Sequence, residues 1–156
     1  MLDIPSITGI VAATGVIVGV VFAVVELRNL VKARQTDVVT GLYSIMSSKE
    51  FMEAWEKVRN RGEIKDVAKY RKKYGFVEVN ILYMIWMELG VLAYKKLVDI
   101  NLVYDLFSGP IKAVWSWLKF AIEDTRKEYN QPQYGWAIEY LYNEMQKREQ
   151  RLQTQQ

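Results

Sequence analysis

The sequence predicts an all-α protein in which a single N-terminal transmembrane helix continues into a small cytoplasmic helical bundle. The segment Ile7–Val25 contains nineteen residues without one charged side chain. After it, apolar residues recur at intervals of three and four, which is the spacing of an amphipathic helix. No run alternates apolar and polar residues for long enough to form a strand.

The segment Ile7–Val25 is long enough to cross a bilayer. At ~1.5 Å per residue it spans roughly 28 Å, close to the thickness of the hydrocarbon layer. A cleaved signal peptide would have a positive N-terminal region, whereas Asp3 is the only charge before this segment. A buried core helix is seldom apolar on every face. We therefore expect residues 1–25 to be a retained membrane anchor.

The basic residues that follow the anchor predict its orientation. Arg28, Lys32 and Arg34 come directly after the span, against Asp3 on the other flank. An excess of lysine and arginine marks the cytoplasmic side. We therefore expect a single-pass protein of the cell membrane, with its N-terminus outside and its C-terminal domain in the cytoplasm. The three basic side chains would determine this topology or contact lipid headgroups.

One face of the anchor carries small residues. Gly15 and Gly19 form a G-x-x-x-G motif, which lets two membrane helices approach closely. Ala12 and Ala23 lie on the same face. The motif also occurs by chance in apolar segments. The face therefore either packs against another membrane helix or has no role.

The amino-acid composition excludes several kinds of metal site and catalytic site. The chain has no cysteine and no histidine, which excludes disulfides, thiolate or imidazole metal sites and any nucleophile that needs a histidine base. Residues 26–156 carry 21 basic and 17 acidic side chains, since Asp3 alone precedes them, and their net charge of +4 is too small to indicate nucleic-acid binding, although it favours an anionic membrane surface. We expect no enzymatic activity, no cofactor and no metal ion.

Residues 26–46 are predicted to extend the membrane helix, and residues 47–147 to form the bundle. Ser47 and Glu50 match a capping box that opens a new helix. The stretch Ile64–Tyr74 is short and basic. It binds either anionic lipid or an acidic partner, or it is a solvated helix face. Its basic residues are Lys65, Lys69, Arg71, Lys72 and Lys73.

The segment Phe76–Leu97 is the most apolar part after the anchor. It could form a second membrane span or the central helix of the bundle. Glu78 and Glu88 would be costly in lipid, so the sequence favours the central helix. Glu88 would then be a buried charge that needs a basic partner, and we expect Arg126, or alternatively Arg34, to supply it.

Three more helices are expected toward the C-terminus. Asp99 caps a short helix that ends at Phe107, and Pro110 begins the next helix as its first residue. A last helix covers residues 133–147. Residues 148–156 form a polar tail that frays or extends this helix.

The C-terminal half contains an ordered series of aromatic and apolar motifs. They are ELGVL at 88–92, LVD at 97–99, VYDLF at 103–107, Trp115, Arg126 and EYLY at 139–142. The series resembles an uncharacterised family of short prokaryotic proteins known only as a domain of unknown function. The resemblance implies one N-terminal membrane helix, an arginine-rich segment and an α-helical domain. It implies no activity, so no functional residue is transferred.

These observations predict a membrane-anchored helical interaction module, which serves as an accessory, scaffolding or self-assembling subunit of a membrane complex. The alternative is a small homo-oligomeric channel or transport component, in which Gly15 and Gly19 pack and Glu26 lies near the pore mouth. The expected partners are membrane lipid and other membrane-protein subunits or further copies of the chain. Nucleic acid is not expected.

Overall fold

The computed structural model describes the backbone of residues 4–154 and the side chains of residues 15–154. This part of the chain contains six helices and no strand, which confirms the predicted all-α class. The helices are α1 (Ile4–Met46), α2 (Lys49–Arg61), α3 (Val67–Tyr74), α4 (Val77–Tyr94), α5 (Ile100–Glu128) and α6 (Trp136–Gln153).

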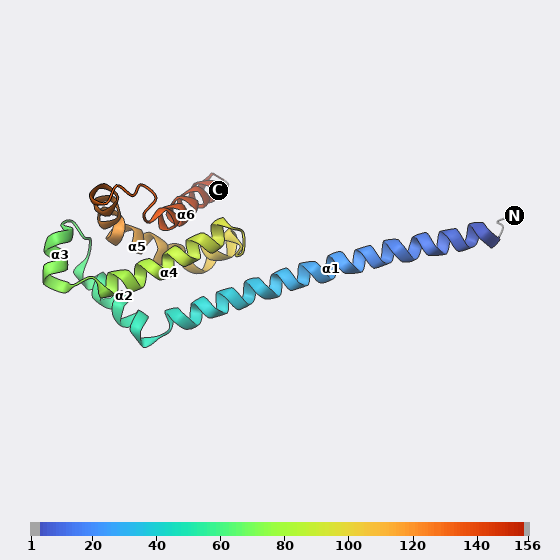
Figure 1. Cartoon of the computed structure of the whole chain (residues 1–156), viewed down its shortest axis with the longest axis horizontal. Helices are drawn as coiled ribbons and strands as arrows, with labels where there is room; N and C mark the ends of the chain where they lie inside the picture. Colours follow the sequence, from blue (N-terminus) through green and yellow to red (C-terminus); the bar gives the residue numbers. More distant parts are fainter. Residues whose placement is uncertain (1–3, 155–156) are drawn as a thin grey trace. The chain divides into compact units, whose positions relative to one another are not determined.

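The chain forms two compact units, residues 1–40 and residues 41–156. The first unit contains most of α1, which runs without interruption through the apolar segment and beyond it (Figure 1). The second unit, here called the helical domain, contains the last residues of α1 and the other five helices. Leu42 is buried there, and the ring centroid of Tyr43 lies 5.7 Å from that of Phe107. The end of the predicted extension therefore packs within the helical domain.

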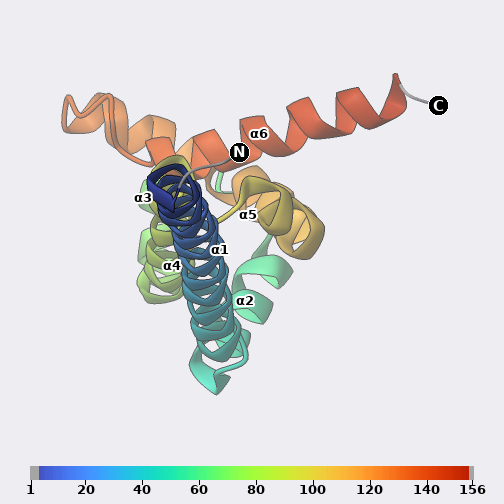
Figure 2. The same cartoon turned by 90° about the vertical axis from the view of Figure 1, so that its right-hand side faces the viewer.

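Helix α4 packs against α2, α5 and α6 in the helical domain (Figures 1 and 2). One face of α4 is buried among these helices, through Val79, Leu82, Trp86, Leu89, Gly90 and Ala93. At Gly90 an added Cβ would lie 2.7 Å from the carbonyl carbon of Ala137 and 2.8 Å from its Cβ, so glycine allows α6 to come this close. The apolar segment Phe76–Leu97 thus packs as the central helix that its sequence favours.

By length and composition alone, α4 is also the one helix within the fully described residues that could cross a membrane. About two fifths of it (39%) is buried inside the chain. The central helix of a soluble bundle has the same composition and length, because it is apolar on most faces. The segment Ile7–Val25 extends beyond the fully described residues and lies outside this comparison.

The structure corrects the predicted break at Pro110. Helix α5 is a single helix with Pro110 in its interior. Proline costs a helix ~3 kcal/mol because it lacks an N–H and its ring crowds the preceding turn. Here Gly109 precedes the proline and has no Cβ to clash with the ring. Phe107 and Ile111 are buried on either side, so one apolar face continues past the proline and packing outweighs the local preference.

The helix ends agree in part with the sequence. Asp99 caps α5 as predicted, because its side chain accepts a hydrogen bond from the backbone N–H of Asn101 at 2.7 Å. Helix α2 is capped by Ser48, not by Ser47, through a 3.2 Å bond from the backbone N–H of Phe51. Helix α6 continues through most of the predicted polar tail.

Candidate functional site

The small-residue face of α1 is uncovered where its side chains are described. Gly15, Gly19 and Ala23 are exposed, and a Cβ added at either glycine would meet nothing within 4 Å. The side chain of Ala12 lies outside the described residues. This face has room for another helix, and its role in helix packing stays a prediction.

The three basic residues after the apolar segment are also exposed. Arg28, Lys32 and Arg34 lie on α1, and none of them belongs to an ion pair within the described part of the chain. They are therefore available to lipid headgroups or to water. Their roles in topology and headgroup contact stay predictions.

The predicted buried pair of Glu88 and Arg126 does not form. Glu88 is exposed on the outer face of α4, four residues after the exposed Met84. Because water solvates an exposed carboxylate, Glu88 needs no basic partner, neither Arg126 nor Arg34. Its neighbours Leu89 and Gly90 are buried, so the carboxylate lies on a different side of the helix from the core. The prediction that Glu88 is a structural buried charge is therefore wrong.

Arg126 instead forms hydrogen bonds to the loop between α5 and α6 and to the first turn of α6. Its Nε donates to the carbonyl oxygen of Tyr134, and its terminal nitrogen donates to Oε2 of Glu139, both at 2.7 Å. The Arg126 side chain is only 20% exposed and that of Glu139 is 39% exposed. One half-buried guanidinium therefore joins the end of α5 to the loop and to the first turn of α6.

Replacing Arg126 by methionine is expected to lower the free energy of unfolding by about 2 kcal/mol, because a carbonyl and a carboxylate lose their charged donor. Glu139→Gln should cost less than about 1 kcal/mol, since the bond to Tyr134 remains. Urea unfolding followed by circular dichroism measures both. As a control, Lys119→Met breaks only an exposed pair with Glu123 and should change stability by less than about 0.5 kcal/mol. Equal losses for the Arg126 and Lys119 variants would contradict the role of Arg126.

An open apolar groove, here called the aromatic groove, lies between the end of α1, α2, α4 and α5. Its volume is about 220 Å³. No charged side chain lines it. The lining residues are Tyr43, Met46, Phe51, Met52, Trp55, Trp86, Leu106, Phe107 and Pro110.

The aromatic groove has an exposed rim and a buried base. Met52 and Leu106 are exposed at the surface, and the Met52 side chain is 54% exposed. Trp86 is buried and packs against Trp55 and Phe107, with ring centroids 6.5 and 6.1 Å away. Nε1 of Trp86 is buried and has no acceptor within the described chain. Apolar walls and flexible methionines suit an apolar side chain presented by a partner helix.

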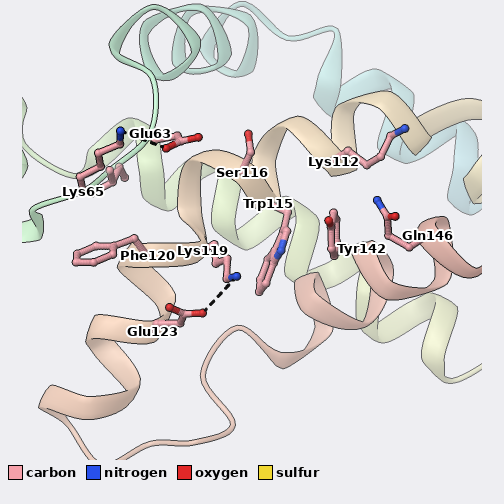
Figure 3. Close-up of a pocket in the computed structure, with 11 residues that line it drawn as sticks. Glu63, Lys65, Lys112, Trp115, Ser116, Lys119, Phe120, Glu123, Tyr142 and Gln146 are labelled. Carbon is pink, nitrogen blue, oxygen red and sulfur yellow. Dashed lines mark ion pairs between the residues drawn. The ribbon is translucent and has the colours of Figure 1, made fainter.

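A second groove of about 580 Å³ lies along α5 and α6, beside the segment that precedes α3 (Figure 3). The rings of Trp115 and Tyr142 stack in it with centroids 5.5 Å apart. Its three lysines each pair with a carboxylate: Lys65 with Glu63, Lys112 with Glu149, and Lys119 with Glu123. Because these pairs neutralise the lysines, the groove offers no concentrated positive charge to an anion and no free acid–base pair.

Tyr83 on α4 stacks against Tyr134 of the loop after α5. The ring centroids are 4.8 Å apart and the planes differ by 11°. Burial raises the pKa of Tyr83 to about 12, with a further contribution from Tyr134. The folded state therefore retains the Tyr83 proton at a pH where an unfolded chain loses it.

The stacked pair gives a pH-dependent contribution to stability. Because the pKa of Tyr83 is raised on folding, its contribution is complete below pH ~10 and is lost as the pH rises through about 12. Tyrosinate absorbance near 295 nm should show that Tyr83→Phe removes a component titrating near pH 12. Tyr134→Phe should move that component to lower pH. Loss of a component titrating near pH 10 in the Tyr83→Phe variant would contradict this assignment.

The described residues contain no cluster of three or more acidic side chains that could hold a metal ion. Glu78 and Glu139, two half-buried acidic groups of the helical domain, are paired with lysine or arginine. The expectations of no metal, no cofactor and no catalysis stay predictions from the composition.

No protein-family model, curated protein or solved structure matches the chain. The resemblance of residues 88–142 to a family of short prokaryotic proteins therefore stays a prediction from their motifs. The surfaces described above are the basis on which a function is proposed.

Proposed function

We propose that the chain is a membrane-anchored helical interaction module. Helix α1 holds it in the cell membrane, and the helical domain binds another subunit of a membrane complex from the cytoplasm. The proposal includes no catalysis, because the chain has no histidine or cysteine and the residues lining its two grooves offer no free acid–base pair.

The observation that carries the proposal is the uncovered apolar surface of α1. Every residue from Gly15 to Arg34 is exposed, and residues 15–25 are all apolar or glycine. Val16 is 67% exposed and Phe22 is 71% exposed. Soluble proteins rarely expose a continuous apolar surface of this extent, and a bilayer would cover such a helix on all sides.

The charges that flank this surface support an orientation with the helical domain in the cytoplasm. Arg28, Lys32 and Arg34 follow the apolar segment, and only Asp3 precedes it. A reporter that is active only in the cytoplasm, fused after Gln156, should be active. An inactive cytoplasmic reporter together with an active extracellular one would reverse the proposed orientation.

The aromatic groove supports binding of a partner, which we take to be an apolar helix from another membrane-protein subunit. Tryptophan and tyrosine dominate the binding energy of many interfaces, and this groove presents Tyr43 and Trp55 with no charged side chain in its lining. Apolar side chains of the partner would fill the groove.

Site-specific photo-crosslinking in native membranes tests the partner site. A photoreactive amino acid at Met52 should give one discrete adduct with another membrane protein, identified by mass spectrometry. Leu106→Lys, on the opposite part of the rim, should abolish that adduct. The same photoreactive residue at the exposed Leu152 on α6 is the matched control and should give none. A Met52 adduct that survives Leu106→Lys, or equal labelling from Leu152, would count against the groove.

The exposed Gly15 and Gly19 face favours one second candidate, a self-assembled channel or transport component. Native mass spectrometry in mild detergent separates the two. A monomer, or a complex of fixed composition with a different subunit, supports the interaction module. A closed ring of identical copies that conducts ions in liposomes would replace it by the channel.

A further inference from the structure

Helix α3 presents a cluster of basic side chains without acidic partners. It lies at one end of the helical domain, next to the ends of α2 and α4 to which it is connected (Figure 1). Its basic residues Lys69, Arg71, Lys72 and Lys73 are all exposed. None of the four belongs to an ion pair in the described part of the chain.

The acidic residues closest to α3 in the sequence are already engaged elsewhere. Glu63 pairs with Lys65 at 3.8 Å, Asp66 caps α3 through the backbone N–H of Lys69 at 2.8 Å, and Glu78 pairs with Lys57 at 3.2 Å and Arg61 at 3.4 Å. The chain therefore does not neutralise the four positive charges of α3. A surface with this much unmatched charge on eight residues attracts an anionic partner.

An apolar strip on α4 begins at Val77, four residues after Lys73. Val77 and Met84 on α4 are 69% and 65% exposed, and Ile81 between them is half-buried. Their spacing of four and three places them on one face of the helix. Arg71 lies 5.0 Å from the centroid of the Phe76 ring, so a basic group covers the junction between α3 and α4. The exposed Glu88 follows at the far end of the strip.

We propose that this basic–apolar surface, made of the four basic residues of α3 and of Val77, Ile81 and Met84, docks the helical domain on an anionic bilayer surface. The inference rests on the proposed function, which places the domain beside a membrane. The basic groups bind anionic headgroups, and the apolar strip enters the boundary of the acyl layer, as in interfacial helices. A nucleic acid would match the charge but would leave the apolar strip exposed to water.

The full-length chain allows a direct test, because it has no native cysteine to compete with a single label. A fluorophore on Val77→Cys reports contact between the surface and lipid in nanodiscs that contain spin-labelled lipid as a quencher. We expect strong quenching when the nanodisc contains phosphatidylglycerol and weak quenching in phosphatidylcholine alone. Salt at about 0.5 M should release the surface, because it shortens the screening length to a few ångströms.

Charge variants identify which residues are responsible. Each basic residue near an anionic surface strengthens binding about fivefold, so Lys69→Gln, Lys72→Gln and Lys73→Gln together should weaken docking about 100-fold. The matched control removes three exposed charges elsewhere that form no ion pair among residues 15–154, through Lys95→Gln, Lys127→Gln and Arg151→Gln, and should leave quenching unchanged. A label on Asn143→Cys of α6 should not be quenched in either lipid.

The outcomes distinguish this inference from the proposed function. A label on Val18→Cys reports whether α1 lies in the bilayer. A quenched Val18 label with an unquenched Val77 label would overturn the docking surface and leave the anchor intact. An unquenched Val18 label would overturn the anchor itself. Quenching of the Val77 label that is equal with and without phosphatidylglycerol would also overturn the docking surface. So would quenching that persists after the α3 substitutions. If α3 instead binds an acidic protein, the Val77 label stays unquenched in nanodiscs that contain phosphatidylglycerol.

Discussion

Replacing Gly90 by alanine is expected to lower the free energy of unfolding by about 3 kcal/mol, because the new methyl group has no room. It would contact the carbonyl oxygen of Ala137, and it would lie 2.7 Å from the carbonyl carbon. These atoms belong to the backbone of α6, which cannot rotate away as a side chain could. Helices α4 and α6 would therefore have to separate, and both bury apolar side chains at this contact.

A second glycine provides the matched control for Gly90. Gly41 is also inside a helix, but it is exposed and a Cβ there meets nothing within 4 Å. Gly41→Ala should raise stability by ~0.5–1 kcal/mol through helix propensity alone. Adding Ala137→Gly to Gly90→Ala should restore only part of the loss, since the α6 backbone stays in place. Urea unfolding that gives the two alanine variants equal stability would contradict the close approach of α4 and α6.

Truncating Trp86 to alanine is expected to cost about 4 kcal/mol, because the indole is 1% exposed and lies at the base of the aromatic cluster. Its loss would leave Trp55 and Phe107 beside a cavity that the helices cannot fully close. Thermal and urea unfolding followed at 222 nm measure this cost.

Replacing Trp86 by phenylalanine shows how much of the stability lost in the alanine variant comes from the lost side-chain volume and how much from a lost hydrogen bond. Nε1 of Trp86 has no acceptor in the described chain, so Trp86→Phe loses no internal hydrogen bond and should cost about 1–2 kcal/mol. A Phe variant as unstable as the Ala variant would contradict this expectation, because the phenylalanine ring should fill most of the cavity that alanine leaves.

The parts of the fold that could be predicted from the sequence are those that depend on local signals. The cap at Asp99 was predictable because a short acceptor precedes an apolar periodic run. The continuity of α1 followed from the absence of proline between Pro5 and Met46. The central position of α4 followed from its composition, since a helix apolar on most faces must be covered by neighbours.

The predictions that were wrong concern positions where tertiary packing, and not a local sequence signal, determines the structure. Pro110 was expected to begin a helix, but buried neighbours on both sides hold α5 together through it. Glu88 was expected to be buried, because an apolar composition does not reveal which face of α4 meets solvent. Arg126 was expected to reach Glu88. Its actual partner, Glu139, lies beyond a loop whose path is not encoded in any local pattern.

The aromatic groove could not be predicted as a site for the same reason. Phe51, Met52 and Trp55 lie close together on α2, and their spacing indicates only an apolar helix face. They become one wall of a groove when Leu106 and Phe107 of α5 lie opposite. By contrast, the basic stretch that contains α3 is visible in the sequence, but only the structure shows that the acids near it are engaged elsewhere.

The tryptophans around the aromatic groove give the protein a built-in optical reporter. Three of its five tryptophans are neighbours, with the Trp55 ring 6.5 Å from Trp86 and 5.0 Å from Trp117. Indoles at these separations couple in the excited state, so their near-ultraviolet circular dichroism responds to small changes in mutual angle. A molecule that enters the groove should shift both this signal and the emission maximum, and an unlabelled titration can then follow its occupancy.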